Sequence, residues 1–111
     1  MAATEYALGL DLIREGRYFE AHEALETAWR AAEPSERDFL QGLVHVAVAW
    51  YQAARGNRYG CVRQLDKAAR RLGPYAPAHR GLDVAGLLAQ IAAASARAGR
   101  GDLALDPVEP D

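Results

Sequence analysis

The sequence predicts a single all-α domain, a compact bundle or array of about five helices that includes helix-turn-helix pairs. Two observations support this class. Half of the 111 residues are hydrophobic, and this set consists mainly of alanine and leucine, a composition that favours helix over sheet. Glycine and proline residues also divide the chain into segments of helical length whose apolar residues recur with helical spacing.

Five helical segments follow from this punctuation, and most have a recognisable start or stop. Thr4 is the predicted cap of the first helix, which ends before Gly16. Pro34 is predicted to stop the second helix, and Ser35 begins a capping-box-like start to the third. Asp83 is the predicted cap of the fifth. The predicted helices cover residues 4–15, 18–32, 35–55, 58–72 and 83–99.

We expect the single helical domain to cover residues 1–99, followed by a C-terminal tail over residues 100–111 that is extended or disordered. The tail contains two prolines and has little to bury. Residues 73–82, between the fourth and fifth helices, contain two prolines and two glycines. This stretch is predicted to form an ordered loop or bend.

Length and composition exclude several classes of protein. A chain of this size builds one core, and with Cys61 as its only cysteine it forms neither an internal disulfide nor a four-thiolate zinc site. The net charge of −2 argues against nucleic-acid binding. The N-terminal residues lack a signal-peptide pattern, and the longest apolar stretch, residues 43–51, is too short to cross a bilayer. We therefore expect a cytoplasmic protein that contacts neither membrane nor nucleic acid.

The second predicted helix turns a histidine toward the protein interior. On a helical wheel, Tyr18, Leu25 and Trp29 form one apolar stripe, and His22 falls inside this stripe. Glu26 follows His22 by one turn and lies at the edge of the stripe. This helix therefore combines an inward imidazole with a neighbouring carboxylate.

The third predicted helix is apolar around most of its circumference, which is typical of a central helix covered on several sides. Its exceptions are Gln41, His45 and Gln52, which are spaced by four and seven residues and so stack along one side, here called the polar line. A buried polar side chain without a partner costs about 1–3 kcal/mol. We therefore expect the polar line to face the inward polar residues of the preceding helix, His22 and Glu26.

Several separated motifs, arriving in a fixed order, carry a resemblance to a known family. They are Tyr18-Phe19-Glu20-Ala21-His22-Glu23-Ala24-Leu25-Glu26-Thr27-Ala28-Trp29, Phe39-Leu40-Gln41-Gly42-Leu43-Val44, the Ala47-Ala49-Tyr51 spacing, Arg55-Gly56-Asn57 and Gly81-Leu82-Asp83. Together they resemble domain-of-unknown-function family 309, over most of the chain from about Gly9 to Leu88. The resemblance implies a small all-helical protein, and the family's loose label implies a predicted metal-dependent hydrolase. The family pattern often has glutamine at position 45 and histidine at position 52, the reverse of this chain.

The pattern His22-Glu23-x-x-Glu26 suggests metal chemistry. It resembles the His-Glu-x-x-His helix of zinc proteases with the last histidine replaced by glutamate, and residues four apart share one helix face. In this hypothesis His22 and Glu26 bind a divalent metal ion such as zinc, and Glu23 is the general base or orients His22. A catalytic zinc needs about three protein ligands. His45 is the assigned third ligand, with Gln41 the other near candidate.

The alternative is that the same residues form a structural hydrogen-bond network. His22 would then bond a carboxylate or Gln41, and the network, with Gln41 and Gln52 as members, would fix the register of the second and third helices. The chain would be a non-enzymatic interaction module or a homodimer. A match between residues 16–28 and 56–68 favours this interpretation, because it suggests two helix-turn-helix units of a helical-repeat type. The sequence does not decide whether the chain is an enzyme.

Two other features of the fourth predicted helix have simple structural explanations. Arg63, Lys67, Arg70 and Arg71 recur at helical spacing and are expected to form a solvated basic face, with a phosphate or RNA contact as the alternative. Cys61 lies between Gly60 and Val62 and is expected to be a small core residue rather than a nucleophile.

Overall fold

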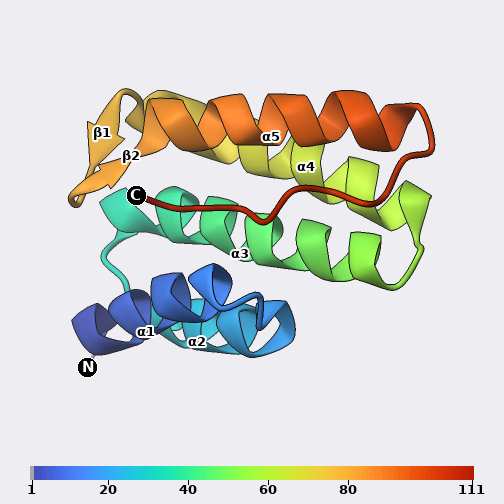
Figure 1. The fold of residues 1–111 in the computed structure, drawn as a ribbon. Helices are drawn as coiled ribbons and strands as arrows, with labels where there is room; N and C mark the ends of the chain where they lie inside the picture. Colours follow the sequence, from blue (N-terminus) through green and yellow to red (C-terminus); the bar gives the residue numbers. More distant parts are fainter. Residues whose placement is uncertain (1) are drawn as a thin grey trace.

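The computed structural model describes residues 2–111, with side chains described from Thr4 onward, and contains five helices and a short hairpin (Figure 1). The elements are α1 (Ala2–Arg14), α2 (Tyr18–Arg30), α3 (Pro34–Ala54), α4 (Arg58–Leu72), a 3-10 turn (Gly73–Tyr75), β1 (Ala78–His79), β2 (Leu82–Asp83) and α5 (Val84–Gly99). The two strands pair antiparallel, with Ala78 opposite Asp83. The predicted all-α class is confirmed. Within residues 2–111, no helix combines the length and apolar character needed to span a membrane.

The helices form a sequential array in which each packs against the next. α1 contacts α2, α2 contacts α3, α3 contacts α4, and α4 contacts α5. The α1–α2 pair lies on one side of α3 and the α4–α5 pair on the other (Figure 1). As its apolar sequence predicts, α3 is the central helix, and eleven of its 21 residues are buried.

Three helices end on the same backbone motif, and this explains the internal sequence match. Gly16, Gly56 and Gly101 have φ values of 75°, 76° and 85°, the left-handed region that glycine adopts without steric cost. Each glycine N–H donates to the carbonyl three residues earlier, and the next N–H donates to the carbonyl five residues earlier, which is the Schellman motif. The first two motifs start equivalent helices, so Ala21 and Cys61 occupy equivalent, fully buried positions.

Two predicted helix starts are wrong. α1 begins at Ala2, so Thr4 lies inside its first turn and does not cap it. α3 begins at Pro34, preceded by Glu33 in an extended conformation, so Pro34 opens this helix and Ser35 is not its cap. Proline suits the first helical position because its missing N–H would have no intrahelical partner there.

Two glycines allow neighbouring helices to approach closely. A Cβ at Gly42 would lie 2.6 Å from Cγ of Leu72, and a Cβ at Gly9 would lie 2.6 Å from Cγ of Leu25. These separations are far below carbon–carbon contact distance. The α3–α4 and α1–α2 contacts therefore depend on the absence of a side chain at these positions.

The segment after α5 runs extended across α3 (Figure 1, red). The Trp50 indole N–H donates to the Asp106 carbonyl at 2.9 Å, and Gln90 exchanges two hydrogen bonds of 2.8 Å with the Glu109 backbone. Val108 is 1% exposed, so this segment buries more than its proline-containing sequence indicates. Trp50 lies about 140° around α3 from a residue five positions earlier, His45. The segment therefore covers the side of α3 opposite the polar line.

Replacing Val108 with alanine is expected to lower the free energy of unfolding by roughly 1–3 kcal/mol, because two buried methyl groups are lost and a cavity remains. Glu109→Ala is the matched control, since Glu109 contacts Gln90 only through its backbone and its loss is expected to stay within about 0.5 kcal/mol. Urea unfolding measures both. Equally small losses for the two variants would contradict the docked position of the segment.

Candidate functional site

The polar line of α3 lies on an open side of this helix, between α2 and α4. Gln41, His45, Val48 and Gln52 fall within about 60° of one another around the helix axis. Two hollows open along this side. One lies toward α4 and includes Gln41 and His45, and the other lies toward α2 and includes Val48 and Gln52. The three polar residues therefore share one side of α3 but face two different neighbouring helices.

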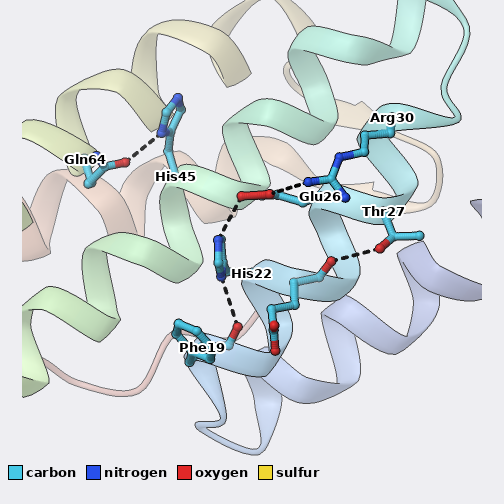
Figure 2. Close-up of polar contacts among 8 residues, drawn as sticks. Phe19, His22, Glu26, Thr27, Arg30, His45 and Gln64 are labelled. Atoms are coloured by element: carbon cyan, nitrogen blue, oxygen red, sulfur yellow. Dashed lines mark hydrogen bonds and ion pairs between the residues drawn. The ribbon is translucent and has the colours of Figure 1, made fainter.

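His22 and Glu26 bond to each other within α2 (Figure 2). Nε2 of His22 lies 2.8 Å from Oε1 of Glu26, and Nδ1 lies 3.1 Å from the Phe19 carbonyl oxygen. Arg30 donates to the second Glu26 oxygen at 3.3 Å. Because a carbonyl and an ionised carboxylate only accept, the ring satisfies both partners when both of its nitrogens carry protons. All these residues belong to one helix, so the pair does not link α2 to α3 as the predicted network would.

His45 bonds to α4 instead of to His22 and Glu26 (Figure 2). Its Nδ1 lies 2.7 Å from Oε1 of Gln64, and since an amide oxygen only accepts, Nδ1 carries the proton. The residue is 8% exposed, and its Nε2 has no hydrogen-bond partner among the described residues. A buried acceptor left unpaired in this way costs about 1–3 kcal/mol.

The surroundings of His45 favour its neutral form. Burial lowers the pKa of His45, and the positive charges of Arg71 and Lys67 lower it further, against the opposing effect of the Gln64 hydrogen bond. With Nδ1 protonated, the neutral ring presents a free lone pair at Nε2.

The residues predicted to bind a metal ion do not meet at one point. Nε2 of His22 and Oε1 of Glu26, which would have to bind the metal, bond to each other at 2.8 Å. His45 bonds to a different helix. Glu23 has an exposed side chain. Within residues 2–111, no group of three His, Cys, Asp or Glu side chains is positioned to hold one ion. The arrangement does not fit the metal that the family label implies, and we derive no reaction step through one.

The hollow toward α2, here called the aromatic pocket, has a volume of about 200 Å³ and is lined by Phe19, His22, Val48, Tyr51 and Gln52. The Phe19 ring centroid lies 5.4 Å from the His22 ring and 5.4 Å from the Tyr51 ring. Phe19 is 50% exposed. The pocket thus has apolar and aromatic walls, with an imidazole and an amide as its polar groups.

The hollow toward α4, here called the basic hollow, has a volume of about 500 Å³. It is lined by Asp38, Gln41, His45, Lys67, Arg70, Arg71 and Pro74. Arg71 donates to Asp38 at 2.7 Å, and Arg70 pairs with Asp66 at 2.8 Å. Three of the four residues of the predicted basic face therefore line a hollow, and only Arg63 stands apart from it.

Sequence reasoning missed Gln64, Phe19 and Tyr51. Gln64 lies on the same side of its helix as the buried Cys61 and Ala68, three residues after one and four before the other. A polar residue in such a position indicates a partner on the neighbouring helix. No comparable signal marks Phe19, because nothing in the sequence shows that its ring stays half-exposed.

Two residues that line neither hollow have structural roles. Cys61 is fully buried, and burial raises the pKa of its thiol, so it is a core residue, as predicted, and a poor nucleophile. Nε2 of His79, which the sequence left without a role, lies 2.8 Å from Glu36, and its ring packs on Phe39 with centroids 4.7 Å apart. These contacts fasten the β-hairpin to α3.

The fold and the site define a small α-helical protein built from helical hairpins, with two hollows of different chemistry along its central helix. The model of the family described as "Domain of unknown function (DUF309)" matches residues 6–64, which is 59 of the 111 residues. The chain belongs to this family, as the sequence motifs predict. Searches of curated proteins and of solved structures find no significant match to the chain.

The buried position of His45 predicts a specific pH dependence. Because its folded-state pKa lies below the ordinary value of 6.5, the unfolded chain binds the extra proton as the pH falls through that value. The contribution to stability is therefore complete above pH 6.5 and declines as the pH is lowered toward the folded-state pKa.

An NMR titration of the His45 ring protons measures this directly, with a midpoint expected below 6.5. In His45→Gln the matching decline in the free energy of unfolding is expected to disappear. A midpoint at or above 6.5 would contradict the described surroundings of the ring.

Proposed function

We propose that this chain is a non-enzymatic binding protein whose aromatic pocket, between α2 and α3, takes a small molecule with a planar apolar group. One observation carries the proposal: the aromatic pocket places the Phe19 and Tyr51 rings beside each other at an open surface, with centroids 5.4 Å apart. Aromatic walls of this kind bind planar groups through stacking and through burial of apolar surface.

The size of the pocket supports this class of ligand. Pockets for whole small molecules are typically about 300–1,000 Å³, and the aromatic pocket has about 200 Å³. It therefore holds one ring system of a ligand, while the rest of the molecule lies outside the pocket. The polar group free to orient this ring system is the amide N–H₂ of Gln52, since the Gln52 oxygen already accepts from Asn57.

The state of the polar residues supports binding over catalysis. Both ring nitrogens of His22 and both carboxylate oxygens of Glu26 already have hydrogen-bond partners. The residues that line the aromatic pocket include no serine, threonine, cysteine or lysine. The two that could act as nucleophiles, His22 and Tyr51, are hydrogen-bonded to Glu26 and Arg55. In this proposal the His22–Glu26 pair is structural, because it holds the imidazole as a fixed wall beside Phe19.

The neutral dye N-phenyl-1-naphthylamine, whose fluorescence rises in apolar surroundings, tests the proposal on the full chain. Saturable binding at one dye per chain is expected. Phe19→Ala should weaken it roughly tenfold, the equivalent of about 1.4 kcal/mol, because one stacking wall is lost.

Tyr59→Ala is the matched control, since Tyr59 is 72% exposed and lies outside the pocket. It is expected to bind the dye like the unmodified chain. Equal effects of the two variants would contradict the proposal. So would a dimer in sedimentation that excludes the dye, because the exposed Phe19 surface would then bind a second copy.

A further inference from the structure

The basic hollow contains a combination of groups that the aromatic pocket lacks. Lys67 and, three and four residues later, Arg70 and Arg71 reach it from one side of α4. Arg70 and Arg71 each have a carboxylate partner, Asp66 and Asp38, whereas no ion pair of Lys67 is present among residues 2–111. Of these carboxylates only Asp38 lines the hollow, so its walls carry three cations and one anion.

A buried group with an unmet hydrogen-bonding capacity lies in the same hollow. His45 is 8% exposed, its Nδ1–H is committed to Gln64 at 2.7 Å, and its Nε2 has no partner. An unpartnered buried nitrogen beside three cations is not needed to hold α3 against α4, since apolar residues do this elsewhere along the interface. Such a nitrogen indicates a place where a ligand atom supplies the missing hydrogen-bond partner.

We propose that the basic hollow binds the phosphate group of a small phosphorylated molecule, with Lys67, Arg70 and Arg71 as its cationic ligands and His45 as its buried partner. A phosphate is favoured over a carboxylate because its three terminal oxygens match three cationic side chains, and a guanidinium keeps free N–H donors after pairing with one carboxylate. This site is independent of the aromatic pocket.

The proton balance at His45 fits a phosphate monoanion. Its remaining P–O–H group donates to Nε2, or the imidazole takes that proton and donates back to the same oxygen, so one proton lies between nitrogen and oxygen in either case. Nε2 is covered in the free protein. A phosphate that reaches it must therefore shift the side chains that line the hollow, of which Lys67 and Arg71 are long and flexible.

The test is a titration of the full chain with inorganic phosphate at constant ionic strength, followed by NMR signals of the His45 ring and the Gln64 side-chain amide. Saturable shifts of both signals are expected. Lys67→Gln should weaken binding roughly tenfold, because a charge-assisted contact is lost. Arg63→Gln removes one positive charge from the same helix outside the hollow and is expected to change the affinity less than twofold. Arg63 is exposed and Lys67 is half-buried at the wall of the hollow, so neither substitution opens the core and the two variants are expected to fold alike.

Parallel titrations with glycerol 3-phosphate and with a short single-stranded RNA identify the source of the phosphate. Binding of inorganic phosphate or glycerol 3-phosphate with the stated Lys67 dependence supports the proposal. Absence of saturable shifts at His45 overturns it. Equal weakening by Lys67→Gln and Arg63→Gln also overturns it, because the attraction would then be diffuse. Binding of the RNA alone overturns it too, since a phosphodiester backbone would then be the ligand.

Discussion

The central constraint on this molecule is the burial of α3, a 21-residue helix that is apolar on nearly every side. No single neighbour can cover such a helix, because packing against one helix buries only one stripe. The array meets this requirement with α2 on one side, α4 on the other and the extended C-terminal segment across the back. The Schellman turns and the close approaches at Gly9 and Gly42 serve the same end, because they set the helices near enough to exclude water.

Two hollows open along the polar line of α3, and this explains where the candidate site lies. α2 and α4 flank the opening but differ in chemistry. α2 supplies Phe19 and the self-contained His22–Glu26 pair, while α4 supplies Gln64 and a row of cations. The two hollows therefore differ in chemistry, one being aromatic and the other basic.

Much of the fold could be predicted from local sequence signals. The central position of α3, the two equivalent hairpins and the cap of α5 at Asp83 all follow from apolar periodicity, glycine turns and capping chemistry. The start of α3 could not be predicted in this way, since Pro34 fits both the end of one helix and the first position of the next. The packing of the C-terminal segment also could not be predicted, because it depends on long-range contacts such as the hydrogen bond from Trp50 to the Asp106 carbonyl.

Several polar residues of the candidate site were predictable, but their partners and the aromatic walls of the pocket were not. Helical spacing correctly groups His22 with Glu26 and places His45 on the polar line. Helical spacing does not show which neighbouring helix a side chain contacts. His45 lies between α2 and α4, and packing decides that its ring turns toward Gln64. The same limit applies to Arg71, whose partner Asp38 lies on α3. Arg70 instead pairs within α4 with Asp66, four residues earlier, as helical spacing allows.

The central claim is that His22 and Glu26 bond to each other while His45 bonds to α4, so that the three side chains do not meet at one metal ion. Calorimetric titration of the full chain with Zn²⁺, after purification without an affinity tag, tests this most directly. The described geometry predicts no one-to-one binding that depends on both histidines. Tight one-to-one binding that is lost in both His22→Ala and His45→Ala would contradict it.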